Sequence, residues 1–248
     1  HNYRVSFPTI ATINGQTLHN HYHGNMIKKG DLFLLDAGAE TEMGYAGDMS
    51  STIPADPQFT PRQREIYEIQ LACHEASVAA LRPGIRFEEV YDISAQIIVE
   101  GLKSLGLMQG NAIEAVKEGA HALFYPHGLG HMMGLDVHDM ENLGEIYVGY
   151  DGKPKSTQFG RKSLRLAREL EPGFVHTIEP GIYFIPELID LWKSEKRLPN
   201  FIKYDKVEEY KGFGGIRNEE DYLITETGAR LLGKKISKKV EDIEKLRN

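Results

Sequence analysis

The sequence predicts a mixed α+β domain, in which strands come first, helices follow and strands then return. Short apolar runs separated by turn residues fill the first part of the chain. The middle part carries apolar residues at helical spacing, and strand-like runs return after Pro126. The 248 residues, of which 41% are hydrophobic, are enough to form one sizeable core.

The first strands are expected before residue 54. Thr9–Ile13 and Gln16–Leu18 flank an Asn-Gly pair, which is favoured in two-residue hairpin turns. Leu32–Ala37 is almost entirely apolar, as is typical of a buried strand. Gly44–Ile53 is expected to pair with it across a turn.

Three helices are expected in the middle of the chain. Thr60, Pro61 and Gln63 provide an N-cap, a first-turn proline and a capping-box partner, so they mark the start of the first helix. That helix ends before a Pro-Gly pair. The second is expected over Phe87–Leu105 and the third over Asn111–Leu123.

The last part of the chain returns to strands. Val175–Phe184 and Tyr222–Thr225 are the clearest of them. Pro186–Lys206 is less regular and is expected to form a loop or the edge of a lid. The tail after Lys234 has the pattern of a charged amphipathic helix.

Composition excludes several classes of protein. A net charge of −7 argues against a nucleic-acid-binding surface, which normally carries a basic excess. No apolar run approaches the roughly 20 residues that span a bilayer, so no membrane segment is expected. A single cysteine, Cys73, excludes a disulfide-stapled scaffold and favours a reducing compartment such as the cytoplasm.

Four acidic residues occupy strand-like contexts. Asp36 ends an apolar run, Asp48 lies in the following expected strand, Glu179 interrupts an apolar segment, and Glu219 follows a Gly-rich one. An ionised carboxylate is costly to bury unless it is paired or binds a metal. Four such residues favour a shared cation.

Histidines cluster in the same part of the chain. His127, His131 and His138 fall within twelve positions, and glycines in the first motif allow close backbone approach. Four carboxylates and one imidazole suit Mn²⁺, Co²⁺ or Zn²⁺. Two such ions can activate a water molecule at neutral pH, so the residues indicate metal-assisted hydrolysis.

These motifs, in this order, resemble the pita-bread metallopeptidases, the family that includes prolidase and aminopeptidase P. The resemblance rests on segments 36–38, 45–48, 127–131, 134–139, 177–181 and 215–219. It implies the pita-bread fold, a curved and mostly antiparallel sheet covered by helices. It also implies that residues 1–248 form a single catalytic domain, without the separate domain that precedes it in the family.

The resemblance implies two divalent metal ions, with Mn²⁺ favoured over Co²⁺ or Zn²⁺. The family's five ligands match Asp36, Asp48, His131, Glu179 and Glu219. In that scheme Asp48 and Glu219 bridge both ions, Asp36 completes the second, and His131 and Glu179 hold the first. Glu179 is also the proton shuttle.

Other residues match substrate contacts of the family. His138 matches a histidine that stabilises the tetrahedral intermediate, and His127 matches a pocket histidine. Arg165 lies in a loop that resembles the prolidase version, where the matching arginine binds the free carboxylate of a dipeptide. A planar guanidinium suits that bidentate contact.

One match is ambiguous, and two details depart from the family pattern. The upstream catalytic histidine matches His19 by its spacing to Asp36, whereas the context of His21 also fits; we prefer His19 and place His21 among the substrate contacts. The spacing between Asp36 and Asp48 is one residue longer than usual, which an extra turn residue or a bulge would absorb. Asn218 replaces an aliphatic residue.

The implied function is hydrolysis of the bond before proline in small peptides, in the manner of prolidase. The alternative within the family is aminopeptidase P, which acts on longer peptides. A methionine aminopeptidase is disfavoured by the prolidase-like loop, and creatinases work without metal. Binding modules of this fold generally lose the metal ligands, whereas all five residue types are kept here. A homodimer is expected for the full-length protein.

Overall fold

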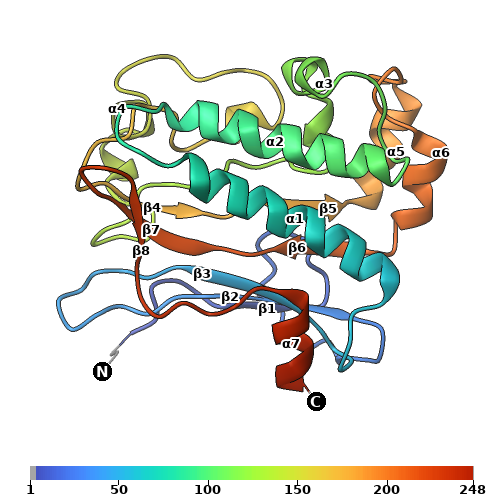
Figure 1. Ribbon diagram of the computed structural model, residues 1–248, viewed down its shortest axis with the longest axis horizontal. Coiled ribbons are helices and arrows are strands. Elements are labelled where there is room, and N and C mark those ends of the chain that lie inside the picture. The colour runs from blue at the N-terminus through green and yellow to red at the C-terminus, as the bar shows by residue number, and fades with distance from the viewer. Residues whose placement is uncertain (1–3, 248) are drawn as a thin grey trace.

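The computed structural model describes residues 4–247 and arranges them in layers (Figure 1). One layer is a sheet of three antiparallel strands in the order β1 (Ile10–Thr12), β2 (Leu32–Ala37) and β3 (Met49–Pro54). Helices α1 and α2 form the opposite layer, and the remaining strands lie between the two.

The middle layer is a long antiparallel ribbon. Strand β4 (Val175–Ile178) pairs with β7 (Glu220–Ile224), which also pairs with β8 (Ala229–Leu231). Farther along, β5 (Gly181–Phe184) pairs with β6 (Gly214–Arg217).

The register is the same on both sides of the gap in this ribbon. Ile178 lies opposite Glu220 and Gly181 lies opposite Arg217, so residues 179 and 180 face residues 219 and 218. Pro180 has no N–H to donate to the ladder, which explains why hydrogen bonding stops there. The two interruptions therefore bring Glu179 and Glu219 together.

Helices α1 (Pro61–Ala80) and α2 (Phe87–Ser104) pack side by side over the ribbon (Figure 1). The predicted start of α1 is confirmed, because Thr60 Oγ1 accepts from Gln63 N–H and Gln63 Oε1 accepts from Thr60 N–H. Buried aromatic and aliphatic side chains from both helices form much of the core.

Shorter elements complete the fold. The helices are α3 (Ala112–Glu118), α4 (Glu145–Val148), α5 (Pro186–Ser194), α6 (Tyr204–Val207) and α7 (Val240–Arg247). The 3₁₀ turns are η1 (Ala120–Leu123), η2 (Glu141–Leu143), η3 (Arg161–Ser163) and η4 (Glu208–Tyr210).

The structure corrects several expectations in the first half of the chain. The Asn-Gly pair does lie in a turn, but Gln16–Leu18 forms no returning strand; β1 pairs with β2 instead. Strand β3 begins only at Met49, and its register with β2 has no bulge, so residues 38–48 form the connection. The third expected helix ends at Glu118, because Gly119 adopts a left-handed conformation with φ of +84°.

Other corrections concern the second half. Val175–Phe184 is divided into two strands at Glu179 and Pro180. The expected loop Pro186–Lys206 contains helix α5, which begins with Pro186 in its first turn. The helix predicted after Lys234 is confirmed, although it forms only from Val240.

Two expectations about composition also have structural counterparts. Within residues 4–247, no helix has the length and apolar character needed to cross a membrane. Cys73 is fully buried and forms no disulfide.

Candidate metal centre

A cavity of 460 Å³ opens beside the interruption in the ribbon. It is lined by every candidate residue that the sequence indicated: His19, His21, Asp36, Asp48, His127, His131, His138, Arg165, Glu179 and Glu219. These residues span 201 positions along the chain, so only the fold brings them together.

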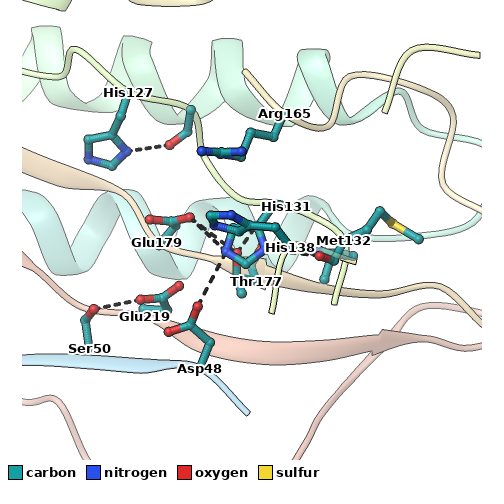
Figure 2. A network of polar contacts seen from close by, with 12 residues as sticks. Asp48, Ser50, His127, His131, Met132, His138, Arg165, Thr177, Glu179 and Glu219 are labelled. Carbon is teal, nitrogen blue, oxygen red and sulfur yellow. Dashed lines mark hydrogen bonds and ion pairs between the residues drawn. The ribbon is translucent and has the colours of Figure 1, made fainter. Parts of the chain in front are cut away.

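Each acidic residue reaches the cavity from an end or a break of a strand. Asp36 lies near the end of β2, and Asp48 immediately precedes β3. Glu179 and Glu219 occupy the two facing interruptions of the ribbon. His131 comes from a segment that runs beside β4. Figure 2 shows Asp48 and Glu219 on one side of His131 and Glu179 beside it.

Three of these side chains form a compact group. One ligand atom each from Asp48, His131 and Glu219 lies within 4.8 Å of the others. His131 Nε2 is 3.5 Å from Asp48 Oδ2 and 3.6 Å from Glu179 Oε1. His131 Nδ1 donates to the carbonyl oxygen of Met132 at 3.1 Å. With a proton on Nδ1, the neutral form of the ring would direct the lone pair of Nε2 toward the carboxylates, as a metal ligand requires.

Asp36 and Glu219 are held by polar partners. Arg217 donates to Asp36 Oδ2 at 2.6 Å, and Ser50 Oγ donates to Glu219 Oε2 at 2.6 Å. The other oxygen of Asp36 and the Oδ1 of Asp48 are buried and have no hydrogen-bond partner within residues 4–247. A buried carboxylate oxygen without a partner is costly, and a cation would satisfy it.

The crowding of carboxylates also fits a cation. Burial raises the pKa of Glu179 to about 7, and the positive charge of His131 opposes this shift. Burial and the charge of Asp48 raise the pKa of Glu219 well above its usual range. Burial likewise raises the pKa of Asp36, against the effect of Arg217. Positive charge is needed to keep these groups ionised together, and divalent ions would supply it.

The protein's own charges supply only part of that compensation. Burial disfavours the charged form of His131, but the Asp48 and Glu179 carboxylates outweigh it and raise its pKa to about 9. Without metal, a protonated His131 would therefore pair with these carboxylates. As a ligand, the imidazole would have to be neutral, so metal and proton compete for the same site.

The remaining histidines surround this group. The rings of His131 and His138 meet edge to face, with centroids 4.4 Å apart. Burial and the charge of His131 lower the pKa of His138 to about 3, so its ring is neutral at pH 7. His127 Nε2 lies 2.9 Å from the hydroxyl of Tyr183. Burial and the charge of Arg217 lower the pKa of His19.

Arg165 reaches the cavity from the loop after η3. In Figure 2 it lies on the opposite side of His131 from Asp48 and Glu219. Its guanidinium forms an ion pair with Glu141, a residue that sequence reasoning did not single out.

Arg217 supports the site and was not assigned a role from the sequence. Arg217 contacts Asp36, Ser50 Oγ at 3.1 Å and Tyr183 Oη at 3.0 Å. Arg217 and Glu219 are two positions apart in a strand-like motif, which places them on one face; this spacing was the available signal.

Helix α1 contacts the interruption in the ribbon through the side chain of Gln70. Asn218 Nδ2 donates to Gln70 Oε1 at 2.5 Å, and Gln70 Nε2 donates to the Pro180 carbonyl at 2.6 Å. The polar residue at 218 thus has a buried polar partner in α1, which an aliphatic residue would not need.

The fold and the cavity have the arrangement of the pita-bread metallopeptidases. A model of metallopeptidase family M24 matches residues 1–226, and the chain belongs to this family. Both the predicted fold and the predicted family are thereby confirmed.

Named relatives fall into two groups. The chain is 36% identical over 218 residues to the Xaa-Pro dipeptidase of Homo sapiens, which covers 88% of this chain and 43% of that protein. It is 39% identical over 245 residues to the Xaa-Pro aminopeptidase of Escherichia coli, covering 97% of this chain and 47% of that protein. The chain thus spans less than half the length of either relative.

Solved structures agree with this grouping. A variant of Escherichia coli aminopeptidase P in complex with substrate matches with a TM-score of 0.77 and 38% identity, covering 98% of this chain and 48% of that one. A zinc-substituted form of the same enzyme in complex with product has the same TM-score, identity and coverage.

Proposed function

We propose that this chain hydrolyses the peptide bond before proline, using two divalent metal ions. The observation that carries the proposal is that one cavity is lined by all five residues that match the family's ligands and also by His19, His127, His138 and Arg165. The names of the relatives, Xaa-Pro dipeptidase and Xaa-Pro aminopeptidase, support the choice of bond.

Asp36, Asp48, His131, Glu179 and Glu219 would hold the ions. Two bound cations supply the Lewis acidity that makes water a nucleophile at neutral pH. We propose Mn²⁺ as the metal, because four carboxylates and a single imidazole make an oxygen-rich site; Co²⁺ and Zn²⁺ are the alternatives.

The other steps fall to side chains of the chain itself. Glu179 would accept a proton at its carboxylate and return it to the leaving amine. The neutral ring of His138, beside His131, would donate a hydrogen bond to the oxyanion that develops on the scissile carbonyl. Phe7, Pro8 and Val137 line the same cavity and offer an apolar surface to a proline ring.

The test is hydrolysis of Gly-Pro, Gly-Pro-amide and a Gly-Pro-containing tripeptide with Mn²⁺, then with excess chelator. We expect glycine release that stops on chelation and returns when metal is restored. A folded protein that binds two equivalents of Mn²⁺ and cleaves none of these peptides would contradict the proposed function.

A further inference from the structure

Arg165 is already occupied by a carboxylate of the chain. Glu141 Oε2 forms an ion pair with Arg165 and lies 4.0 Å from His138 Nδ1. The Glu141 side chain is only 16% exposed, whereas that of Arg165 is 38% exposed. The carboxylate therefore lies behind a guanidinium that lines the cavity.

The backbone keeps the two partners together. Met140 has φ of +58°, a left-handed conformation that costs a non-glycine residue about 1 kcal/mol, and it turns the chain between His138 and Glu141. On the other side, Ala167 N–H and Arg168 N–H both donate to the Gly149 carbonyl at 2.8 Å. The segment that carries Glu141 thus also holds the loop that carries Arg165.

This pair changes what Arg165 can recognise. An unpaired guanidinium at the end of the cavity would bind the free carboxylate of a dipeptide bidentately. With Glu141 in place, that carboxylate must displace Glu141 or share Arg165 with it, and two like charges then lie close together. A proline followed by another residue or by an amide brings no negative charge to this position.

We propose that Glu141 is a specificity-determining residue that masks Arg165 and selects peptides extended beyond proline over free dipeptides. This inference rests on the proposed hydrolysis before proline. It moves the substrate class toward aminopeptidase P, although the loop around Arg165 resembles that of prolidases. Glu141, which the loop motif does not include, makes the difference.

The experiment compares Gly-Pro with Gly-Pro-amide, which differ in the charge at the C-terminus. In the Mn²⁺-loaded full chain, we expect Glu141→Gln to raise the ratio of kcat/KM for Gly-Pro to that for Gly-Pro-amide about tenfold, since roughly 1.4 kcal/mol corresponds to a factor of ten. The change should appear mainly as a lower KM for Gly-Pro.

Glu145→Gln is the matched control. Glu145 lies in the same segment, but it pairs with Lys155 rather than with Arg165. We expect it to leave the substrate ratio unchanged. A Glu141→Gln effect should also disappear in an Arg165→Gln background, because the two residues act through one contact.

Calorimetric binding of L-proline and L-prolinamide repeats the comparison without turnover, and Glu141→Ala provides a second variant if Glu141→Gln does not fold. A tighter relative binding of proline in either variant supports the inference. The contrary outcome is that the protein cleaves both Gly-Pro and Gly-Pro-amide, but the variants change neither the kcat/KM ratio of these substrates nor the relative binding of L-proline and L-prolinamide. Glu141 then does not mask Arg165, while the proposed function stands. If wild-type protein cleaves no Xaa-Pro peptide, the proposed function itself fails.

Discussion

Glu179 differs from the other carboxylates in its contacts. Its Oε1 lies 3.6 Å from His131 Nε2 and 3.5 Å from Thr177 Oγ1, whereas Asp36 and Glu219 accept short hydrogen bonds from Arg217 and Ser50. A carboxylate without a strong fixed donor keeps its oxygens free to hold a proton. This is the property that a general base needs.

We therefore expect Glu179→Gln to retain most of the bound metal but to lower turnover of Gly-Pro peptides by about 10²- to 10⁴-fold, the usual contribution of a positioned acid or base. The amide keeps the size and one coordinating oxygen but cannot accept the proton. Elemental analysis of the purified variant, combined with steady-state kinetics, checks both parts. Turnover within a few-fold of wild type would exclude the shuttle role.

At this scale, the sequence indicated the residues but not their partners. All ten candidate residues line one cavity. They could be predicted because the order of the motifs and the residue types can be recognised in the sequence. The ion pair of Arg165 with Glu141 and that of Arg217 with Asp36 join residues 24 and 181 positions apart. No local pattern reveals such a contact, since it depends on how distant segments pack.

The element that positions His131 is the extended segment beside β4. Thr177 N–H donates to the His131 carbonyl at 3.0 Å, and Glu179 N–H donates to the Leu129 carbonyl at 2.8 Å. Between them, Gly130 lies so close to β4 that a Cβ there would be 2.1 Å from the Thr177 carbonyl oxygen. The backbone that carries one proposed ligand, His131, thus packs directly against the strand that leads to another, Glu179.

We expect Gly130→Ala to push this segment away from β4. The overlap should lower the free energy of unfolding by about 1–3 kcal/mol. It should also weaken metal binding by about tenfold or more, in line with disturbed ligand support. Urea unfolding and metal titration measure the two effects.

Gly212→Ala is the control for that substitution, because nothing lies within 4 Å of a Cβ at Gly212. Its effect on unfolding should stay within about 0.5 kcal/mol. Equal metal affinity in the Gly130 variant and wild type would show that the close approach does not position His131.

The elements themselves were predicted unevenly. The start of α1 could be predicted from its capping box, because a helix cap is a local sequence pattern. Helix α5 was missed even though its first-turn proline and the spacing of Leu188, Ile189 and Trp192 are helical signals. The division of Val175–Phe184 at Pro180 could be foreseen only from the missing N–H of proline. The pairing of this segment with β6 and β7 was seen only in the structure.

At the scale of the whole molecule, the C-terminal segment closes the fold beyond the residues that match the family. Lys238 Nζ donates to the Ser50 carbonyl at 3.1 Å, and Tyr67 Oη donates to the Lys238 carbonyl at 2.9 Å. This segment thus connects β3, which carries Ser50, to α1. Helix α7 then buries one face.

We expect Ile243→Ala to lower the free energy of unfolding by about 2–3 kcal/mol, since the Ile243 side chain is 7% exposed and packs in the core. Leu246→Ala, in the same helix, is the control; Leu246 is 83% exposed and its loss should cost no more than about 0.5 kcal/mol. Urea denaturation of both variants gives the comparison. Equal effects would mean that α7 does not dock as described.

The last whole-molecule property is the response of stability to acid. His121 in η1 is fully buried, and its Nε2 lies 2.8 Å from Tyr91 Oη. The charged groups nearby are Arg161 and its ion-pair partner Asp92, both close to Tyr91. Burial, aided by the charge of Arg161, lowers the pKa of His121 to about 3.

Because this folded-state pKa lies below the unfolded value of about 6.5, the unfolded chain binds the extra proton as pH falls. The stability that neutral His121 allows is complete above pH 6.5 and is lost progressively between pH 6.5 and 3. The resulting loss between pH 7 and pH 5 is about 2 kcal/mol from this residue. In His121→Gln, which cannot be protonated, the slope of unfolding free energy against pH should be smaller by up to one proton. Urea unfolding at pH 7, 6 and 5, with chelator present for both proteins, measures it. Identical slopes would mean that His121 takes up its proton equally in the folded and unfolded states.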